Sequence, residues 1–174
     1  MDWHNILFQV IDLRSFSSVW YWIMLAVLWS SMSYYVLGVP FDLITKARQR
    51  GGQDQDDMVD LVRINVNRLL TISQTTGPIL IGIVSFILTT LLLLGFVYGV
   101  ELAQALFLVA LPLSVLGAVS VASARRIRAA DPEPEQLYAM LLRHRLWTQI
   151  IGMVAIFVTA MYGMFQLLGT LRGL

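Results

Sequence analysis

The chain has 174 residues, of which 57% are hydrophobic and 13% are charged, and its formal net charge is +1. Soluble domains carry about 25% charged residues. Together with a mean hydropathy of +0.72, this composition excludes a soluble domain and indicates a polytopic membrane protein with one domain over residues 1–174. The chain has no Cys, which excludes disulfides, thiolate metal sites and Cys nucleophiles.

Four apolar runs are long enough to cross a bilayer core, which takes about 20 helical residues. They cover residues 16–40, 77–98, 102–124 and 146–168. We therefore expect an all-α membrane protein with four transmembrane helices. Pro112 lies inside the third run, where a proline is expected to kink the helix.

Three shorter amphipathic segments are expected to lie along the membrane surface. The first covers residues 2–16 and the second residues 56–73. The apolar face of the second comprises Met58, Leu61, Val62, Val66, Leu69 and Leu70. The third covers residues 131–147, and its helix is expected to continue into the fourth span.

The basic residues predict the orientation in the membrane. The segments 41–76 and 125–145 together hold ten of the twelve Lys and Arg residues, and the opposite side holds Arg14 and Arg172. Because basic residues concentrate in cytoplasmic loops, both segments are expected to be cytoplasmic, and both termini are expected to lie outside.

Glu101 is the sole charged residue between positions 69 and 124. Inside a membrane, an ionisable residue would suggest a functional site, such as a proton or cation relay. A helix over 77–98 rises about 33 Å, so it already reaches the far surface. We therefore expect Glu101 in the first turn of the next helix, where the helix dipole stabilises a carboxylate.

The residues that could bind a cofactor or a metal are few. His4 and His144 are the two histidines, and neither is expected at mid-membrane; His144 is expected at the surface near lipid headgroups. The acids between positions 54 and 60 lack the glycine and the spacing of a calcium loop. We expect no catalytic residue, no cofactor and no metal.

The cytoplasmic arginines are expected to contact anionic lipid headgroups. A nucleotide is the alternative ligand, and no interaction with nucleic acid is expected. The candidate headgroup residues are Arg125, Arg126, Arg128, Arg143 and Arg145.

Small residues recur at helical spacing on three of the spans. Such stripes let helix backbones approach closely, either within one chain or between chains. The candidate packing positions are Gly95, Gly99, Ala110, Ser114, Ala118, Ala122, Ala155, Thr159 and Gly163.

Four strings resemble a family of small four-span alphaproteobacterial membrane proteins that often carries an automatic label as a component of the Suf iron–sulfur assembly complex. They are "DLRSFSSVWYWIMLAVLWSS", "VLGVPFD", "DLVRINVNRLL" and "RHRLWTQIIGMVAIFVTAMYGM". The resemblance covers most of the chain. Iron–sulfur clusters are held by Cys ligands, so it implies a protein that anchors or neighbours such a complex.

These patterns favour a non-catalytic protein of the bacterial inner membrane that acts as an accessory or scaffolding subunit. Its expected partners are membrane lipids and another membrane complex or a second copy. Two alternatives stay open: a small homo-oligomeric channel or transporter, and a lipid-modifying membrane enzyme.

Overall fold

The computed structural model describes residue 16 and residues 18–171, and this part of the chain is almost wholly helical. Its helices are α2 (Val19–Tyr34), α3 (Phe41–Arg50), α4 (Gln53–Thr75), α5 (Gly77–Leu92), the π-helical turn η2 (Leu93–Val97), α6 (Glu101–Ala130) and α7 (Pro134–Leu171). The predicted all-α class is confirmed. The predicted surface helix over 2–16 falls almost entirely outside the described residues.

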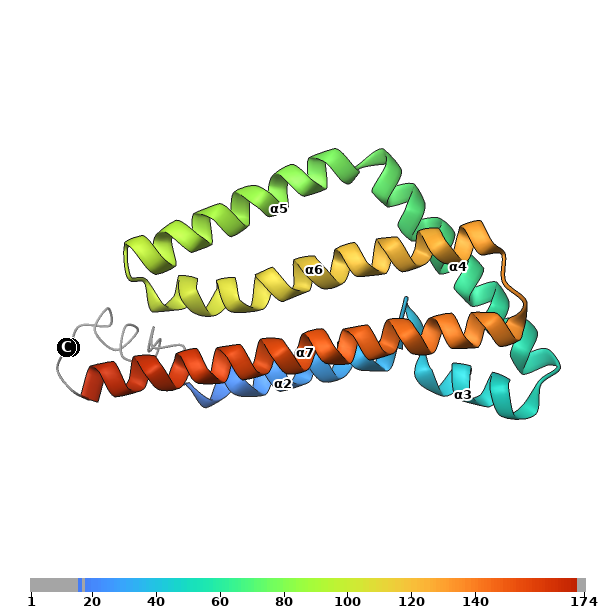
Figure 1. Cartoon of the computed structure of the whole chain (residues 1–174), viewed down its shortest axis with the longest axis horizontal. Coiled ribbons are helices and arrows are strands. Elements are labelled where there is room, and N and C mark those ends of the chain that lie inside the picture. Colours follow the sequence, from blue (N-terminus) through green and yellow to red (C-terminus); the bar gives the residue numbers. More distant parts are fainter. Residues whose placement is uncertain (1–15, 17, 172–174) are drawn as a thin grey trace, which may run out of the picture.

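Helices α2, α5, α6 and α7 run along the length of the molecule (Figure 1). α6 lies between α5 and α7, and α2 packs alongside α7. The shorter helix α3 and the amphipathic helix α4 gather at the end of the bundle where α6 ends and α7 begins. This arrangement brings the two basic segments of the sequence to the same end.

Three of the helical segments are long and apolar enough to cross a membrane. They are Gly77–Val97, Glu101–Ala130 and Pro134–Gly169. The last two extend well beyond the predicted spans, because α6 has 30 residues and α7 has 38 residues. The segment 125–145 is therefore made of two helix ends joined by a short turn. The expected continuity of the helix at its carboxyl end with the apolar run 146–168 is confirmed.

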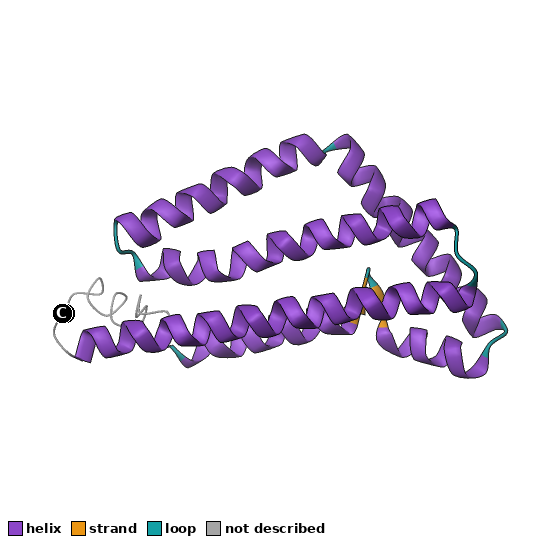
Figure 2. Ribbon diagram, in the orientation of Figure 1, coloured by secondary structure: helices purple, strands orange, loops and turns teal. Residues whose placement is uncertain are grey.

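The first predicted span, 16–40, is wrong at its carboxyl end. α2 stops at Tyr34, after 16 residues, and strands β1 (Tyr35–Val36) and β2 (Val39–Pro40) form an antiparallel hairpin between α2 and α3 (Figure 2). Leu37 and Gly38 have φ values of +50° and +79°, which is the left-handed conformation that a tight hairpin turn needs at both central positions. Hydropathy alone does not reveal this turn.

The buried residues form two clusters. One lies between α2, α6 and α7 and contains Phe16, Tyr21, Leu25, Trp29, Ala105, Val109, Leu116 and Ala155. The other joins the hairpin, α3, α4 and the adjoining ends of α6 and α7; its α4 members are Met58, Val62, Val66 and Leu70. The predicted apolar face of α4 is thus confirmed, but it packs against the chain's own helices and not against a membrane surface.

Candidate functional site

The hairpin between α5 and α6 explains the lone carboxylate of the apolar region. Glu101 is the first residue of α6, and Gly99 makes the turn before it with a φ of +73°. The expected bend is therefore confirmed. Glu101 Oε1 also accepts a hydrogen bond from the backbone N–H of Phe16 at 2.8 Å, so the carboxylate ties the start of α6 to the segment that precedes α2.

Gly95 is a site of close approach within the chain. A Cβ atom at this position would lie 2.9 Å from the backbone nitrogen of Gln104 and 3.0 Å from its Cγ, which is closer than real Cβ contacts come. A side chain here would push η2 away from α6. The candidate packing positions Gly95 and Gly99 therefore have different roles: Gly95 packs against α6, and Gly99 forms the turn.

The small residues of α7 also pack within the chain. Ala155 and Thr159 are buried, and the Thr159 hydroxyl donates a hydrogen bond to the Ala155 carbonyl at 2.7 Å. A Cβ at Gly163 would lie 3.2 Å from the Phe16 ring. Gly152 belongs to the same face although the sequence pattern missed it, since a Cβ there would lie 2.9 Å from the Trp29 ring.

The small residues of α6 face outward toward its second half. Ala118 and Ala122 are exposed, whereas Ala110 and Ser114 are half-buried. The Ser114 hydroxyl donates to the Ala110 carbonyl at 2.6 Å, so it has a partner in its own helix. Of the three predicted stripes, the one on α6 is therefore the one that the chain leaves uncovered.

A hydrogen-bond network between η2, α6 and α7 was not foreseen from the sequence. Gln166 Nε2 donates to Gln104 Oε1 at 2.8 Å and to the Tyr162 hydroxyl at 2.9 Å. Gln104, which is 5% exposed, donates in turn from Nε2 to the Gly95 carbonyl at 2.7 Å. Gln104 and Gln166 are polar residues within apolar runs, but their pairing depends on tertiary packing across 62 positions.

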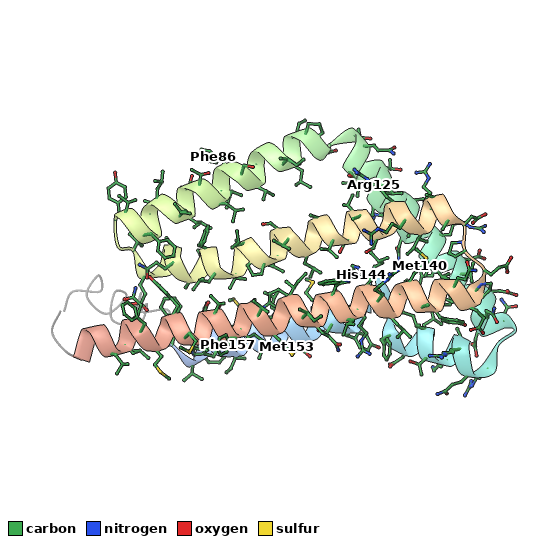
Figure 3. The ribbon with its side chains drawn as sticks, in the orientation of Figure 1. Phe86, Arg125, Met140, His144, Met153 and Phe157 are labelled. Carbon is green, nitrogen blue, oxygen red and sulfur yellow. The ribbon has the colours of Figure 1, made fainter. Side chains whose placement is uncertain are left out.

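His144 is buried, which corrects the expectation of a surface residue. It is 4% exposed and lies on the side of α7 that faces α6 (Figure 3). Its Nδ1 lies 3.1 Å from the Ser123 hydroxyl of α6, and its carbonyl accepts a hydrogen bond from the Thr148 hydroxyl. His144 lies on the face of α7 that packs against α6. Its sequence neighbours Arg143 and Arg145 are charged, so the sequence indicated a surface position for it.

The Ser123–His144 pair resembles two members of a catalytic triad, but its surroundings favour a structural role. The adjoining cavity has a volume of about 30 Å³, which is the space of about one water molecule and too small for a lipid substrate. Ser123 also lies within a long helix and not on the sharp turn that exposes a nucleophile. The pair acts as a polar link between α6 and α7.

The five candidate headgroup arginines fall into two groups. Arg145 is half-buried; its Nε donates to the Ser33 carbonyl at 3.3 Å, and its guanidinium carbon lies 3.6 Å from the centre of the Phe41 ring. It therefore fastens α7 to α2 and α3. The other four side chains are exposed near the end of the bundle that holds α3 and α4, and they are Arg125, Arg126, Arg128 and Arg143.

A cavity of about 350 Å³ lies between α4, the end of α6 and the turn that leads to α7. Its floor is apolar and consists of buried side chains: Val62, Val66, Ile127 and Leu137. Its rim carries the exposed side chains of Arg63, Asn67, Arg128 and Asp131. The sequence pointed to Arg128 alone, because Arg63 and Asp131 belong to segments that meet only in the fold.

Within residues 16 and 18–171, no group of three or more His, Asp or Glu side chains has the geometry of a metal site. Comparisons with protein-family models, with curated proteins and with solved structures found no match to this chain.

Proposed function

We propose that this protein is a non-catalytic membrane subunit that acts as an accessory or scaffold by docking onto a helix of another membrane protein or of a second copy. The observation that carries the proposal is the exposure of α5: every residue from 78 to 83 is exposed. Successive helical residues are about 100° apart, so these six residues cover the whole circumference. The first half of α5 is therefore largely uncovered by the described part of the chain.

The neighbouring surface of α6 is also open and is lined by small residues. Gly117, Ala118 and Ala122 are exposed, and a Cβ at Gly117 or at Gly82 of α5 would meet no atom within 4 Å. In lipid there is no hydrophobic gain from helix association, so close backbone packing over small residues supplies much of the attraction. A helix of a partner fits this requirement.

The internal hydrogen bonds support a contact role over transport. A transport path is lined by polar or ionisable groups that pair with the moving ion or substrate. Here the buried polar side chains Gln104, Thr159 and Thr148 all bond within the chain. This supports the accessory role over the channel.

The proposed arrangement in the bacterial inner membrane has four spans, with both basic segments cytoplasmic and both termini outside. α2 and adjoining residues would form the first of the four spans. The adjoining residues are needed because the 16 residues of α2 rise about 24 Å, whereas the bilayer core is about 30 Å thick. The gathering of α3, α4 and the ends of α6 and α7 at one end of the bundle supports this orientation. The resemblance to the alphaproteobacterial family stays a prediction.

The experiment compares two Ala→Ile variants in nanodiscs of native lipid. Ala118→Ile adds bulk to the open surface of α6, and Ala160→Ile adds the same bulk to an exposed position of α7. We expect wild type and Ala160→Ile to run larger than the 19.6 kDa chain by light scattering, and Ala118→Ile to lose that association. A wild type that runs as a lone chain and copurifies with no other protein would overturn the proposal.

A further inference from the structure

The cavity between α4, α6 and the α6–α7 turn carries three charges that have no ion-pair partner among residues 16 and 18–171. Arg63 and Arg128 bear positive charges and Asp131 bears a negative charge. In the described part of the chain, the ion pair with a nitrogen–oxygen distance of 4.0 Å or less joins Arg50 and Asp54, which lie outside the cavity. The two guanidinium groups and the carboxylate are therefore free to bind a ligand.

The signs of these charges define the chemistry of that ligand. Arginine is suited to phosphate, because its planar guanidinium donates two parallel hydrogen bonds to phosphate oxygens. A simple anion would meet the like charge of Asp131, and a simple cation would meet two arginines. A zwitterion with a phosphate and an ammonium group satisfies all three side chains.

The position of the cavity relative to the apolar span fits a lipid headgroup. Arg128 lies four residues beyond the end of the apolar run at Ala124, which is about 6 Å along a helix. The headgroup layer on each side of a bilayer is about 5–8 Å thick. The volume of about 350 Å³ lies at the lower end of the range of small-ligand pockets, about 300–1,000 Å³.

We infer that this cavity binds the phosphoethanolamine headgroup of a phospholipid, with Arg63 and Arg128 on the phosphate and Asp131 on the ammonium. The floor formed by Val62, Val66 and Ile127 would accept the apolar part of the glycerol backbone. The inference rests on the proposed insertion in a membrane but not on the accessory role. It assigns a lipid preference to the protein, which bulk electrostatic attraction to anionic lipid would not give.

The test is native mass spectrometry of the delipidated full chain after adding back one lipid at a time. The lipids are phosphatidylethanolamine, phosphatidylcholine and phosphatidylglycerol with the same acyl chains. The methylated ammonium of phosphatidylcholine cannot donate a hydrogen bond, and phosphatidylglycerol has no ammonium. We expect phosphatidylethanolamine to be retained about fivefold better than phosphatidylglycerol, which is the size of one exposed ion pair. Its advantage over phosphatidylcholine should be smaller, because choline keeps the charge and loses the hydrogen bond.

Variants assign the preference to the cavity. Asp131→Asn should abolish the preference for phosphatidylethanolamine, and the fold should survive because Asp131 has a φ of +39°, a conformation that Asn tolerates. Arg63→Gln and Arg128→Gln should lower the retention of all three lipids. Arg125→Gln is the control, since it removes an exposed arginine of the same helix that does not line the cavity.

Two results would overturn the inference. One is equal or better retention of phosphatidylglycerol, with a further gain in Asp131→Asn, which would show a site for anions in general. The other is competition by soluble glycerophosphoethanolamine at the affinity of the lipid, which would show that a free phosphate ester and not a membrane lipid is the ligand. Both results leave the test of helix docking unaffected.

Discussion

Gln166 of α7 and Gln104 of α6 are joined by a hydrogen bond of 2.8 Å between Nε2 and Oε1, inside a bundle whose helices are mostly apolar. Gln104 passes the connection on to the Gly95 carbonyl of η2. One pair of amides therefore links η2, α6 and α7 near the end where α5 turns into α6.

We predict that this pair contributes measurable coupling to the stability of the bundle. Gln104→Leu and Gln166→Leu are combined in a double-mutant cycle, with unfolding followed in mixed micelles. Hydrogen bonds between membrane helices contribute about 0.6 kcal/mol on average and up to about 1.7 kcal/mol, so the coupling should lie in this range. Gln149→Leu paired with Gln104→Leu is the control, because no hydrogen bond joins these two residues. A coupling energy of zero for the first pair would contradict the structure.

Two tyrosines should respond in opposite ways to the loss of their hydroxyl groups. The Tyr21 hydroxyl donates to the Ala105 carbonyl at 3.3 Å, whereas the Tyr138 hydroxyl is buried without a hydrogen-bond partner in the described chain. A typical hydrogen bond contributes about 1 kcal/mol, and an unsatisfied buried group costs about 1–3 kcal/mol. Tyr21→Phe should therefore lower the free energy of unfolding by about 1 kcal/mol. Tyr138→Phe should leave it unchanged or raise it. Equal losses for both would show that the Tyr138 hydroxyl has a hydrogen-bond partner, contrary to the structure.

Glycine substitutions along one hairpin arm should separate a close approach from an open surface. Gly95→Ala would place a methyl group 2.9 Å from the Gln104 backbone, and overpacking of this kind costs about 1–3 kcal/mol. Gly82→Ala meets no atom within 4 Å and should be neutral or slightly stabilising, because Ala favours a helix. The measurement is the unfolding midpoint of each variant in the same detergent. A Gly95→Ala protein as stable as Gly82→Ala would argue against the tight contact between η2 and α6.

The sequence predicted what depends on period and length, and it missed what depends on tertiary contacts. The face of α4 followed from its helical spacing, and the turn before Glu101 followed from the length of the preceding run. The hairpin at Leu37 was missed, because apolar residues fill the turn and no polar signal breaks the run. The inward turn of His144 was also missed, because its partner Ser123 lies 21 positions away and the local charges indicated a surface.

The candidate sites show the same division. The small residues of α7 were recognised as a packing face, but the sequence did not reveal that the aromatic side chains of α2, including Trp29, fill that face from within the chain. From spacing alone, the small residues of α6 and those of α7 were equally good candidates for a contact with another chain. In the structure those of α7 are buried, whereas Ala118 and Ala122 of α6 are exposed. The charged cavity combines residues from α4, α6 and the following turn, so only the fold brings them together.

The last prediction concerns the orientation of the bundle in the membrane, and the absence of Cys makes it directly testable. Gln53 begins α4 at the charged end, and Tyr98, which is 75% exposed, lies at the opposite end in the α5–α6 hairpin. Because ten of the twelve basic residues lie on the side of Gln53, this side should be cytoplasmic. An impermeant thiol reagent added to intact spheroplasts should label Tyr98→Cys at once and should label Gln53→Cys only after the membrane is opened. Thr76→Cys, an exposed position at the junction of α4 and α5, is the second cytoplasmic probe and should behave as Gln53→Cys does. The opposite orientation would be indicated if intact spheroplasts label Gln53→Cys and Thr76→Cys but not Tyr98→Cys. Immediate labelling of all three would show that no membrane separates these sites.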